Sequence, residues 1–374
     1  MENTLITEYL AEQANTVLIG MSGGVDSSVA AYLMQQKGYR CIGATMRLFD
    51  NSILGQGQES TCCSLDDVED ARSVAQRLGM PHYVFNFQQD FENQVIRRFV
   101  DSYEAGQTPN PCIDCNRYLK FHRLLHRALE LGYGYVVSGH YARIRQDPDT
   151  GRYLLYKAVD KAKDQTYFLA CLDQEQLAHT QFPLGELTKE QVRQIAQEQG
   201  FINARKRDSQ DICFVPDGDY AAFLERYTGK KYPSGDYLDL QGHVVGHHRG
   251  AVCYTLGQRK GLGIALGAPV YVCGKDMENN TVTVGPNEAL YRNALRADNW
   301  NWFPFPALTQ PMPVTVKIRH SQNEQPATVY PEEKGCTRVV FDTPQRAITP
   351  GQAVVLYQDD LVIGGGTITE AFSI

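Results

Sequence analysis

The stretch TVLIGMSGGVDSSVAAYLMQQK, residues 16–37, decides the fold of this chain. Thr16–Gly20 is a short apolar run with β-branched residues, which predicts a buried strand. Residues 22–28 form a small-residue loop, and apolar residues then recur at helical spacing. A strand, a glycine loop and a helix in this order point backbone N–H groups and a helix N-terminus at an anion. The sequence therefore predicts a phosphate-binding loop, in which Gly23 and Gly24 let a phosphate approach the backbone.

The loop differs from the two commonest nucleotide-binding motifs. It has no Gly-Lys-Ser/Thr of a Walker A loop and no G-x-G-x-x-G of a dinucleotide site. The string Ser22-Gly-Gly-Val-Asp-Ser27 instead resembles the PP-loop of the ATP pyrophosphatases. That family cleaves ATP between its α and β phosphates and adenylates a carbonyl or carboxyl oxygen. The alternative is a glycine turn before an ordinary helix, and the strand–loop–helix context favours the PP-loop.

Length and composition indicate a multidomain globular protein. The chain has 374 residues, of which 43% are hydrophobic and 21% charged, so we expect two or three soluble domains. Its start is polar and acidic rather than signal-like, and no run is long and apolar enough to span a membrane. We therefore expect a cytoplasmic protein without a membrane partner. Ten cysteines in a reducing compartment more plausibly carry chemistry or bind metal than form disulfides.

Charge is unevenly distributed along the chain. The net charge is −7, yet residues 115–145 hold six Lys or Arg and one acid, which makes this window +5 and the remainder −12. A local basic face on an acidic protein permits phosphate contact, and a solvated helix face would give the same composition.

Strand and helix patterns alternate through the first half of the chain. Strands are expected at 40–46, 82–87 and 135–139, and helices at 64–78, 90–105 and 116–131. This alternation predicts a parallel sheet covered on both sides, with ligands at the carboxyl ends of its strands. The prediction places Gly20–Ser27, Met46 and Gly139-His140 around one crevice.

The second half has a different texture. A hairpin is expected at 141–157, and Thr188 with Gln191 forms a capping box before another helix. Glycines and short β-like runs replace the alternation after Gly218, and several short strands from Asn293 onward predict an antiparallel barrel or sandwich. We expect domains at 1–217, 218–288 and 289–374.

Two cysteine-containing stretches are candidates for chemistry. In Thr108-Pro-Asn-Pro-Cys-Ile-Asp-Cys115, two prolines stiffen a loop and Cys112 and Cys115 are spaced C-x-x-C at a helix N-terminus, which favours the thiolate. A redox pair, half a metal site, catalytic thiols and two inert cysteines are the possible interpretations. Cys213, within Asp208–Phe214, would alone be assigned to a core. Beside a PP-loop and a C-x-x-C pair, we interpret Cys213 as functional.

The helix after Cys115 has an apolar face and a basic face. Its apolar residues follow helical spacing, and four basic residues line another side: Arg117, Lys120, Arg123 and Arg127. Because this basic face begins beside a reactive thiol, we expect a phosphate-rich substrate near Cys115.

Taken together, these motifs resemble one family over nearly the whole chain. They occur in the order seen in the tRNA-specific 2-thiouridylases: Gly20–Ser27, Thr108-Pro-Asn-Pro, Cys115-Asn with Lys120-Phe121, Ser138-Gly-His-Tyr-Ala142, Lys163-Asp-Gln165, Asp208–Phe214 and Gly257-Gln-Arg-Lys-Gly-Leu-Gly263. The resemblance implies a PP-loop domain of the adenine nucleotide hydrolase type, a small central domain and a C-terminal β-barrel. It implies replacement of the 2-oxygen of the wobble uridine in a tRNA anticodon loop by sulfur.

The resemblance also implies roles for individual residues. ATP, with Mg²⁺ on its phosphates, would be held by Gly20, Met21, Ser22, Gly23, Gly24, Val25, Asp26, Ser27, Met46 and Gly139. Cys213 would carry a persulfide supplied by a cysteine desulfurase through a sulfur-relay protein, Cys115 would be the nucleophile, and a Cys115–Cys213 disulfide would form on turnover. The target base would meet Asn110, Pro111 and Cys112. The remaining tRNA contacts would be His140, Lys163, Asp164, Gln165, Arg319, His320 and Gln352.

One departure from the family pattern keeps a second mechanism open. Many members have Asp where this chain has Cys112, so the catalytic role given to that Asp does not transfer. Cys112, Cys115 and Cys213 make three thiolates, the number that would hold a [4Fe–4S] cluster with one open iron. Persulfide relay and cluster-bound sulfide are therefore both retained, with preference for the relay. Cys62 and Cys63 stay unassigned.

Two other classes of protein are alternatives. A PP-loop synthetase acting on a small molecule would release pyrophosphate without tRNA. An RNA-binding or metal-sensing protein with a decayed nucleotide site would release none, and the intact Ser22–Ser27 loop argues against it.

Overall fold

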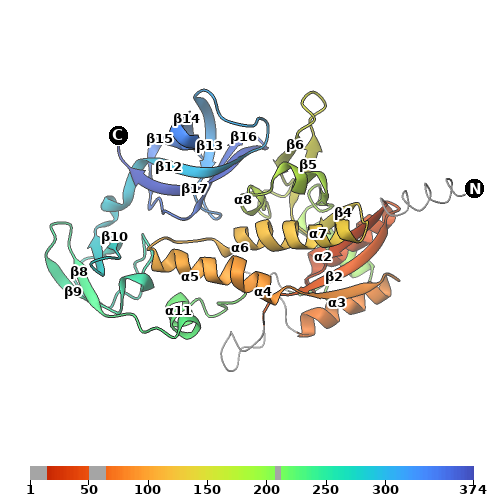
Figure 1. Ribbon diagram of the computed structural model, residues 1–374, viewed down its shortest axis with the longest axis horizontal. Coiled ribbons are helices and arrows are strands. Elements are labelled where there is room, and N and C mark those ends of the chain that lie inside the picture. The colour runs from red at the N-terminus through yellow and green to blue at the C-terminus, as the bar shows by residue number, and fades with distance from the viewer. Residues whose placement is uncertain (1–14, 50–64, 207–211) are drawn as a thin grey trace, which may run out of the picture. The chain divides into compact units, whose positions relative to one another are not determined.

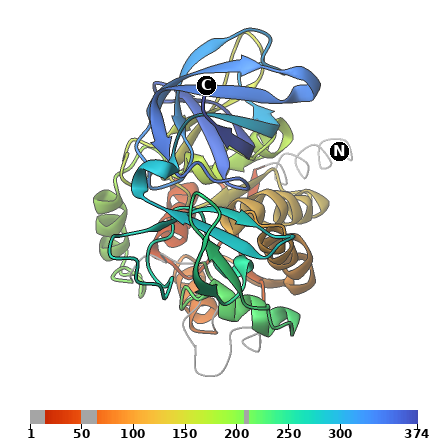
Figure 2. The same ribbon diagram turned by 90° about the vertical axis from the view of Figure 1, so that its left-hand side faces the viewer.

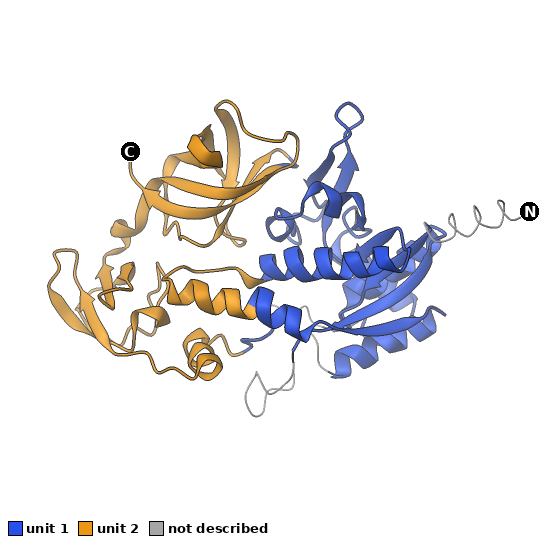
Figure 3. Cartoon of the chain, in the orientation of Figure 1, with its two compact units in different colours: residues 1–95, 112–216, 360–362 blue, residues 96–111, 217–359, 363–374 orange. Residues whose placement is uncertain are grey.

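The computed structural model describes residues 15–49, 65–206 and 212–374. Its contacts divide the chain into two compact units (Figure 3). Unit 1 comprises residues 1–95, 112–216 and 360–362, and unit 2 comprises 96–111, 217–359 and 363–374. The expected loop at Asn51–Ser60, Cys62, Cys63 and Asp208–Asp211 lie outside the described residues.

Unit 1 is built on the expected parallel sheet (Figure 1). Its strands, in the spatial order β3-β2-β1-β4-β7, are β3 His82–Asn86, β2 Arg40–Arg47, β1 Thr16–Gly20, β4 Tyr135–Ser138 and β7 Thr180–Gln181. β7 is not among the predicted strands, because two residues carry no alternation. The chain runs outward from β1 to β3 and then returns to β4, so β1 and β4 flank the point where the strand order reverses.

Helices cover both faces of this sheet. The helices of unit 1 are α2 Val25–Gln36, α3 Leu65–Arg77, α4 Gln88–Phe91, α6 Pro111–Asp114, α7 Leu124–Glu130, α8 Thr166–Leu169, α9 Gln174–Ala178 and α10 Lys189–Glu198, with π-helical segments η2 Glu92–Ile96 and η3 Cys115–Arg123. Alternate residues of β1 separate the two layers. Val17 and Ile19 pack with α2, α3 and α10, whereas Leu18 packs with α7. Every residue of β1 up to Ile19 is buried, as in other doubly covered parallel sheets.

The helix that carries the C-x-x-C pair begins earlier than expected. The spacing predicts a start at Asn116, but α6 begins at Pro111 and continues through η3 and α7 to Glu130. Proline suits the first helical position, because its missing N–H has no partner there in any case. The expected apolar face is confirmed, since Phe121, Leu124 and Ala128 are buried.

A β-hairpin leaves unit 1 after β4. β5 Ala142–Gln146 pairs antiparallel with β6 Tyr153–Lys157, as the turn sequence predicted. Three residues near the C-terminus complete this region of the unit. Leu361 pairs with Tyr156, and Asp360 accepts hydrogen bonds from the backbone N–H of Lys157 (2.8 Å) and from the side chain of Arg143 (2.8 Å).

Unit 2 contains two helices, a small sheet and a barrel. The helices are α5 Arg97–Glu104 and α11 Tyr220–Thr228, and their aromatic residues pack together. The small sheet has the order β10-β11-β8-β9 and consists of β10 Tyr271–Asp276, β11 Thr281–Gly285, β8 Gly235–Leu238 and β9 Val244–His248. Short 3₁₀ segments occur at η4 Ala251–Cys253, η5 Asn287–Leu290 and η6 Glu333–Gly335.

The expected C-terminal barrel is confirmed (Figure 2). Six strands in the fully described segment 291–372 form it: β12 Tyr291–Trp302, β13 Met312–Lys317, β14 Gln325–Pro331, β15 Thr337–Arg346, β16 Ala353–Gln358 and β17 Leu361–Phe372. Pairing of β12 with both β15 and β17 closes the cylinder. The long β12 is not among the predicted strands, because its RNALRADNWNW core has no clean alternation. In the described part of the chain, no helix is both long and apolar enough to cross a bilayer.

Candidate active site

The loop after β1 is held in one conformation by its neighbour β2. The N–H of Met21 donates to the Ala44 carbonyl (2.8 Å), and the Thr45 hydroxyl donates to the Met21 carbonyl (2.9 Å). Within the loop, Ser27 Oγ accepts from the N–H of Ser22 (3.3 Å) and donates to the Gly24 carbonyl (3.0 Å). The serine at the end of the motif therefore fixes the glycines before it.

Two glycines are required here by close backbone contacts. Gly23 has φ +73°, and a Cβ at this position would lie 2.4 Å from the carbonyl oxygen of Asp67. Gly139 follows β4, and a Cβ there would lie 2.7 Å from the backbone of Asp26 and Ser27. The structure thus brings Gly139 against the first turn of α2, as expected for the end of a neighbouring strand. Met46 lies on β2, two residues beyond the partner of Gly20.

Asp26, the acidic residue of the loop, is already engaged by two side chains. Tyr141 donates its hydroxyl proton to Asp26 Oδ1 (2.8 Å), and the ammonium of Lys189 lies 2.8 Å from both carboxylate oxygens. Lys189 is buried, 8% exposed, at the first position of α10. The sequence predicts the Thr188 cap beside it but gives no signal for Lys189, because nothing local links that lysine to a loop 163 residues earlier.

Two further residues support the loop from the segment before Cys213. The Asn203 side chain donates to the Gly23 carbonyl (3.0 Å) and to Ser28 Oγ (2.9 Å). Lys206 bridges Asp67 (2.7 Å) and Asp70 (2.6 Å) on α3, the helix against which Gly23 packs. No local pattern in the sequence pointed to either residue.

The segment expected to contact tRNA at 163–165 is tied to the same loop. Gln165 brackets Tyr141: its backbone N–H donates to the Tyr141 carbonyl (3.0 Å), and its side-chain oxygen accepts from the Tyr141 N–H (2.9 Å). Asp164 is buried and accepts from Ala158 N–H (3.0 Å) and Thr166 Oγ1 (2.6 Å). A chain of hydrogen bonds therefore leads from Gln165 through Tyr141 to Asp26.

His140, another expected tRNA contact, has a buried ring. The ring packs between Phe121 and Phe182, and its Nδ1 lies 2.6 Å from the Ser138 hydroxyl. Burial and, secondarily, the nearby Lys120 ammonium hold the pKa of His140 well below its usual range. The imidazole is therefore neutral at neutral pH.

Two thiols lie at the start of the long helix of unit 1, and a third contacts its backbone. Cys112 is exposed at the second position of α6, and Cys115 is half-buried one turn later. Cys171, which the sequence analysis passed over, lies with its sulfur 3.7 Å from the Ile113 carbonyl. Burial raises the pKa of Cys171 to about 11, so it stays protonated and is not a candidate nucleophile.

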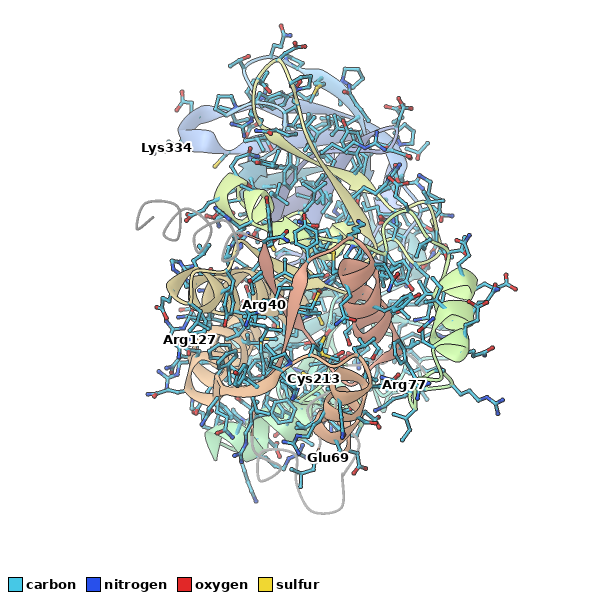
Figure 4. All side chains as sticks on the ribbon, turned by 90° about the vertical axis from the view of Figure 1, so that its right-hand side faces the viewer. Arg40, Glu69, Arg77, Arg127, Cys213 and Lys334 are labelled. Atoms are coloured by element: carbon cyan, nitrogen blue, oxygen red, sulfur yellow. The ribbon has the colours of Figure 1, made fainter. Side chains whose placement is uncertain are left out.

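The Cys213 segment is anchored by its aromatic neighbour. Phe214 is buried and packs edge-on against Phe91, which in turn contacts Phe49. Cys213, labelled in Figure 4, is itself half-buried. All three candidate cluster ligands are described, yet no group of three His, Cys, Asp or Glu among the described residues is arranged to hold a metal ion. The thiols as placed do not fit a [4Fe–4S] cluster, and we derive no step through one.

The basic face of the long helix is partly neutralised. Arg123 Nε lies 3.1 Å from Asp90, and Arg127 pairs with Glu130 (3.0 Å) and covers the Phe85 ring. Arg127 extends outward from its helix (Figure 4). Both arginines are about half exposed, so their partners lower the local charge without removing the guanidinium groups from solvent.

The remaining predicted contacts lie in unit 2. The Gln352 side chain donates to the carbonyls of Thr108 (2.8 Å) and Pro109 (3.3 Å), which precede Asn110 and Pro111. Arg319 donates to the carbonyls of Arg346 (3.0 Å) and Ala347 (2.6 Å), and His320 beside it is exposed. Gln352 and Arg319 thus brace the backbone of their own unit, a role that their motif did not reveal.

A parallel sheet with a Ser-Gly-Gly-Val-Asp-Ser loop at its β1–β4 reversal defines a nucleotide-binding α/β protein of the PP-loop class. Three family models match the chain: a tRNA methyl transferase HUP domain (residues 15–217), a tRNA methyl transferase PRC-barrel domain (221–286) and an aminomethyltransferase β-barrel domain (292–368). The chain belongs to the tRNA-specific 2-thiouridylase family.

Two curated relatives illustrate the extent of the match. The tRNA-specific 2-thiouridylase MnmA of Acetivibrio thermocellus is 52% identical over 94% of this chain and 98% of its own length. The enzyme of that name from Heliobacterium modesticaldum is 51% identical over 94% of this chain and 92% of its own. A solved 4-thiouridine synthetase–RNA complex with bound ATP aligns over 56% of this chain and 50% of its own, at 18% identity and a TM-score of 0.36, too distant to add to the assignment.

Proposed function

We propose that this protein is an ATP-dependent tRNA sulfurtransferase that converts the wobble uridine of tRNA to 2-thiouridine. The observation that carries the proposal is the near-full-length similarity to tRNA-specific 2-thiouridylases, at about half of all positions. The loop geometry around Gly23 and Gly139 supports ATP as the activating substrate, because both glycines allow close backbone packing that holds the loop at the N-terminus of α2, where an anion is favoured.

In the first step, the C2 oxygen of the uridine attacks the α-phosphate of ATP, and pyrophosphate leaves. The residues proposed to hold ATP are Gly20, Met21, Ser22, Gly23, Gly24, Val25, Asp26, Ser27, Met46 and Gly139. Mg²⁺ bound to the phosphates would neutralise their charge, and we assign it no protein ligand. Lys189 and Tyr141 keep Asp26 in place, so the loop meets the nucleotide already shaped.

In the second step, the outer sulfur of a Cys213 persulfide bonds to C2, and the oxygen leaves with AMP. The Cys115 thiolate then attacks Cys213 Sγ and breaks its bond to the transferred sulfur, which stays on the base as 2-thiouridine. A Cys115–Cys213 disulfide results, and a cellular thiol reductant must reduce it before the next turnover. A cysteine desulfurase, directly or through a sulfur-relay protein, supplies the persulfide.

The tRNA is proposed to bind by its anticodon loop, where the target base is unpaired and costs little to extrude. Asn110, Pro111 and Cys112 are proposed to meet the base, and His140, Lys163, Asp164, Gln165, Arg319, His320 and Gln352 to support tRNA binding. We propose domain boundaries at 217/218 and 288/289, which the extents of the three family models support.

The test is a thiolation assay on unmodified tRNA with ATP, Mg²⁺, a cysteine desulfurase and cysteine, with 2-thiouridine measured by mass spectrometry. We expect Cys115→Ala and Cys213→Ala to abolish the product, and Cys336→Ala on the barrel to leave it unchanged. Iron and sulfide are quantified after anaerobic purification. If wild type holds stoichiometric iron and Cys112→Ala loses it, the cluster mechanism is correct and the persulfide relay is wrong. Pyrophosphate release without tRNA would favour a small-molecule synthetase instead.

A further inference from the structure

The glycine-rich motif Gly257-Gln-Arg-Lys-Gly-Leu-Gly263 has no role in the reaction as proposed. It forms a loop of unit 2 between η4 and β10, here termed the 257–263 loop. Gly257, Gly261 and Gly263 have φ values of +82°, +76° and +71°, a conformation that other residues rarely adopt. Three left-handed residues within seven positions indicate a backbone shape that depends on glycine.

The side chain of Gln258 fixes this shape from inside. Its oxygen accepts from the N–H of Thr255 (3.0 Å), and its amide nitrogen donates to the Lys260 carbonyl (3.0 Å). The loop is also joined to β10, because Gly257 N–H donates to the Val272 carbonyl (2.8 Å) and the Gln258 carbonyl accepts from Val272 N–H (3.0 Å). A loop held at both ends and across its middle loses little entropy when it binds a ligand.

The base of the loop rests on the barrel segment that Arg319 holds. Arg346 donates to the Gly257 carbonyl (3.4 Å), and a Cβ at Gly257 would lie 2.9 Å from the Cβ of Ala347. Arg319 donates to the carbonyls of those same two barrel residues. The loop and a residue proposed for tRNA binding therefore belong to one hydrogen-bonded network within unit 2.

The outer part of the loop offers cationic and backbone donors to solvent. Arg259, Lys260 and Gly261 are exposed, whereas Leu262 is buried and anchors the loop. Within the described residues, neither Arg259 nor Lys260 has a carboxylate partner, in contrast to Arg123 and Arg127. In the same part of the chain, the N–H groups of Arg259, Lys260 and Gly261 have no protein acceptor.

We propose that the 257–263 loop binds backbone phosphates of the tRNA substrate. Phosphate oxygens accept hydrogen bonds from cationic side chains and from backbone N–H groups exposed on a glycine-rich turn, and this loop offers both. Such contacts do not distinguish one base from another. Arg259 and Lys260 repel each other on a rigid loop, and a bound anion would offset this repulsion. The chain around them has a net charge of −7, so the two cations stand out as a local positive site. The inference rests on the proposed function for the identity of the polyanion.

The test compares two double variants that remove the same charge. Arg259→Gln/Lys260→Gln alters the loop, and Lys231→Gln/Lys334→Gln removes two exposed lysines elsewhere in unit 2 (Lys334 is labelled in Figure 4). Affinity for unmodified tRNA is measured by fluorescence anisotropy between about 50 and 200 mM salt. We expect the loop variant to bind roughly tenfold more weakly and its log–log salt slope to fall by about 1.5, and the control to stay near wild type.

A third variant separates binding from folding. Gln258→Ala keeps both cations but removes the internal brace, so we expect weaker affinity with an unchanged salt slope. Equal losses in the loop and control variants, or an unchanged slope in the loop variant, would overturn the inference. Failure of wild-type protein to bind or thiolate tRNA would instead overturn the proposed function, so the two failures are distinguishable.

Discussion

Asp26 is the residue on which the nucleotide loop and its surroundings converge. A half-buried carboxylate in contact with a buried ammonium is stable only as a pair, because either charge alone would lose its compensation. Lys189 has 11% of its side chain exposed and Asp26 30%, so solvent screens this pair less than a surface pair.

We expect Lys189→Met to lower the free energy of unfolding by about 2 kcal/mol, because it leaves the Asp26 carboxylate with only the Tyr141 hydroxyl. The matched control is Lys161→Met, whose ammonium pairs with Asp360 while 58% exposed and should cost no more than about 0.5 kcal/mol. Urea unfolding measures both. Equal losses in the two variants would mean that the Lys189–Asp26 pair behaves as a surface pair.

The buried histidine gives the protein a pH dependence of defined sign. Because the folded-state pKa of His140 is lowered, the unfolded chain binds more protons between the two pKa values. The stability contributed by neutral His140 is therefore fully present above pH ~6.5 and is lost as the pH falls below it. His82, whose pKa burial also lowers, acts in the same direction.

We expect the urea concentration at the unfolding midpoint of wild type to decrease when the pH is lowered from about 7.5 to about 5.5. The decrease should be smaller in His140→Asn, which lacks the buried imidazole. His126→Asn, on an exposed histidine, is the control and should follow wild type. A decline in His140→Asn as steep as in wild type would assign the pH dependence to other groups.

At the scale of elements, the turn between β15 and β16 supports the segment that leads to the cysteine pair. Thr108 N–H donates to the Pro350 carbonyl (3.0 Å), and Gln352 holds the next two carbonyls. Gly351 has φ +89°, and a Cβ there would lie 2.9 Å from Gln107 and 3.0 Å from the Thr108 nitrogen. The turn and the 107–109 segment therefore fit only with glycine between them.

Gly351→Ala should destabilise the protein through both its backbone angle and this contact. Gly335→Ala isolates the first effect, because Gly335 has φ +75° and a Cβ added there would meet nothing within 4 Å. We expect about 1 kcal/mol for Gly335→Ala and at least about 2 kcal/mol for Gly351→Ala, by urea unfolding. We also expect slower tRNA thiolation in Gly351→Ala and unchanged thiolation in Gly335→Ala. Equal costs would show that the 107–109 segment moves aside freely.

The elements that the sequence predicted are those with strong local signals. β1 was predicted with its observed bounds, and the capping box of Thr188 and Gln191 is present. β7 and β12 were missed because pairing with neighbours, rather than their own alternation, makes them strands. The predicted helix start at Asn116 is wrong, because proline is a strong loop signal and Pro111 instead occupies the first helical position of α6.

In the candidate site too, the sequence predicts features that local motifs encode and does not predict those that depend on tertiary contacts. The glycine loop and the approach of Gly139 followed from motif and strand order. Lys189, Asn203 and the role of Tyr141 were not found, because their partners lie more than a hundred residues away and only tertiary structure joins them. Spacing alone also could not show that Gln352 braces its own unit.

At the scale of the whole molecule, unit 2 takes residues 96–111 from within the first half of the chain. Phe99 and Tyr103 of this segment are buried against Phe223 and Tyr220 of α11. The predicted first domain, 1–217, therefore contains helix α5, whose apolar face is covered by residues that follow position 217 in the chain.

We expect a 1–217 fragment to bind a hydrophobic dye and to aggregate, because Phe99 and Tyr103 lose their cover. Phe99→Ser/Tyr103→Ser within the fragment should reduce dye binding, measured by ANS fluorescence and light scattering against the full-length protein. A monomeric fragment that unfolds cooperatively without binding dye would show that this domain boundary is also a folding boundary.

Asp360–Val362 belongs to unit 1 although residues 217–359 of unit 2 separate it from the rest of that unit. The hairpin partner of Tyr156 and the acceptor for Arg143 are therefore synthesised only after residues 217–359. On the ribosome, the nucleotide-binding unit stays incomplete until codons 360–362 are translated and their residues have left the exit tunnel, since residues still in the tunnel cannot pair. A message truncated just before codon 360 would thus yield a chain with every proposed catalytic residue and an unfinished first unit, which proteolytic quality control can recognise.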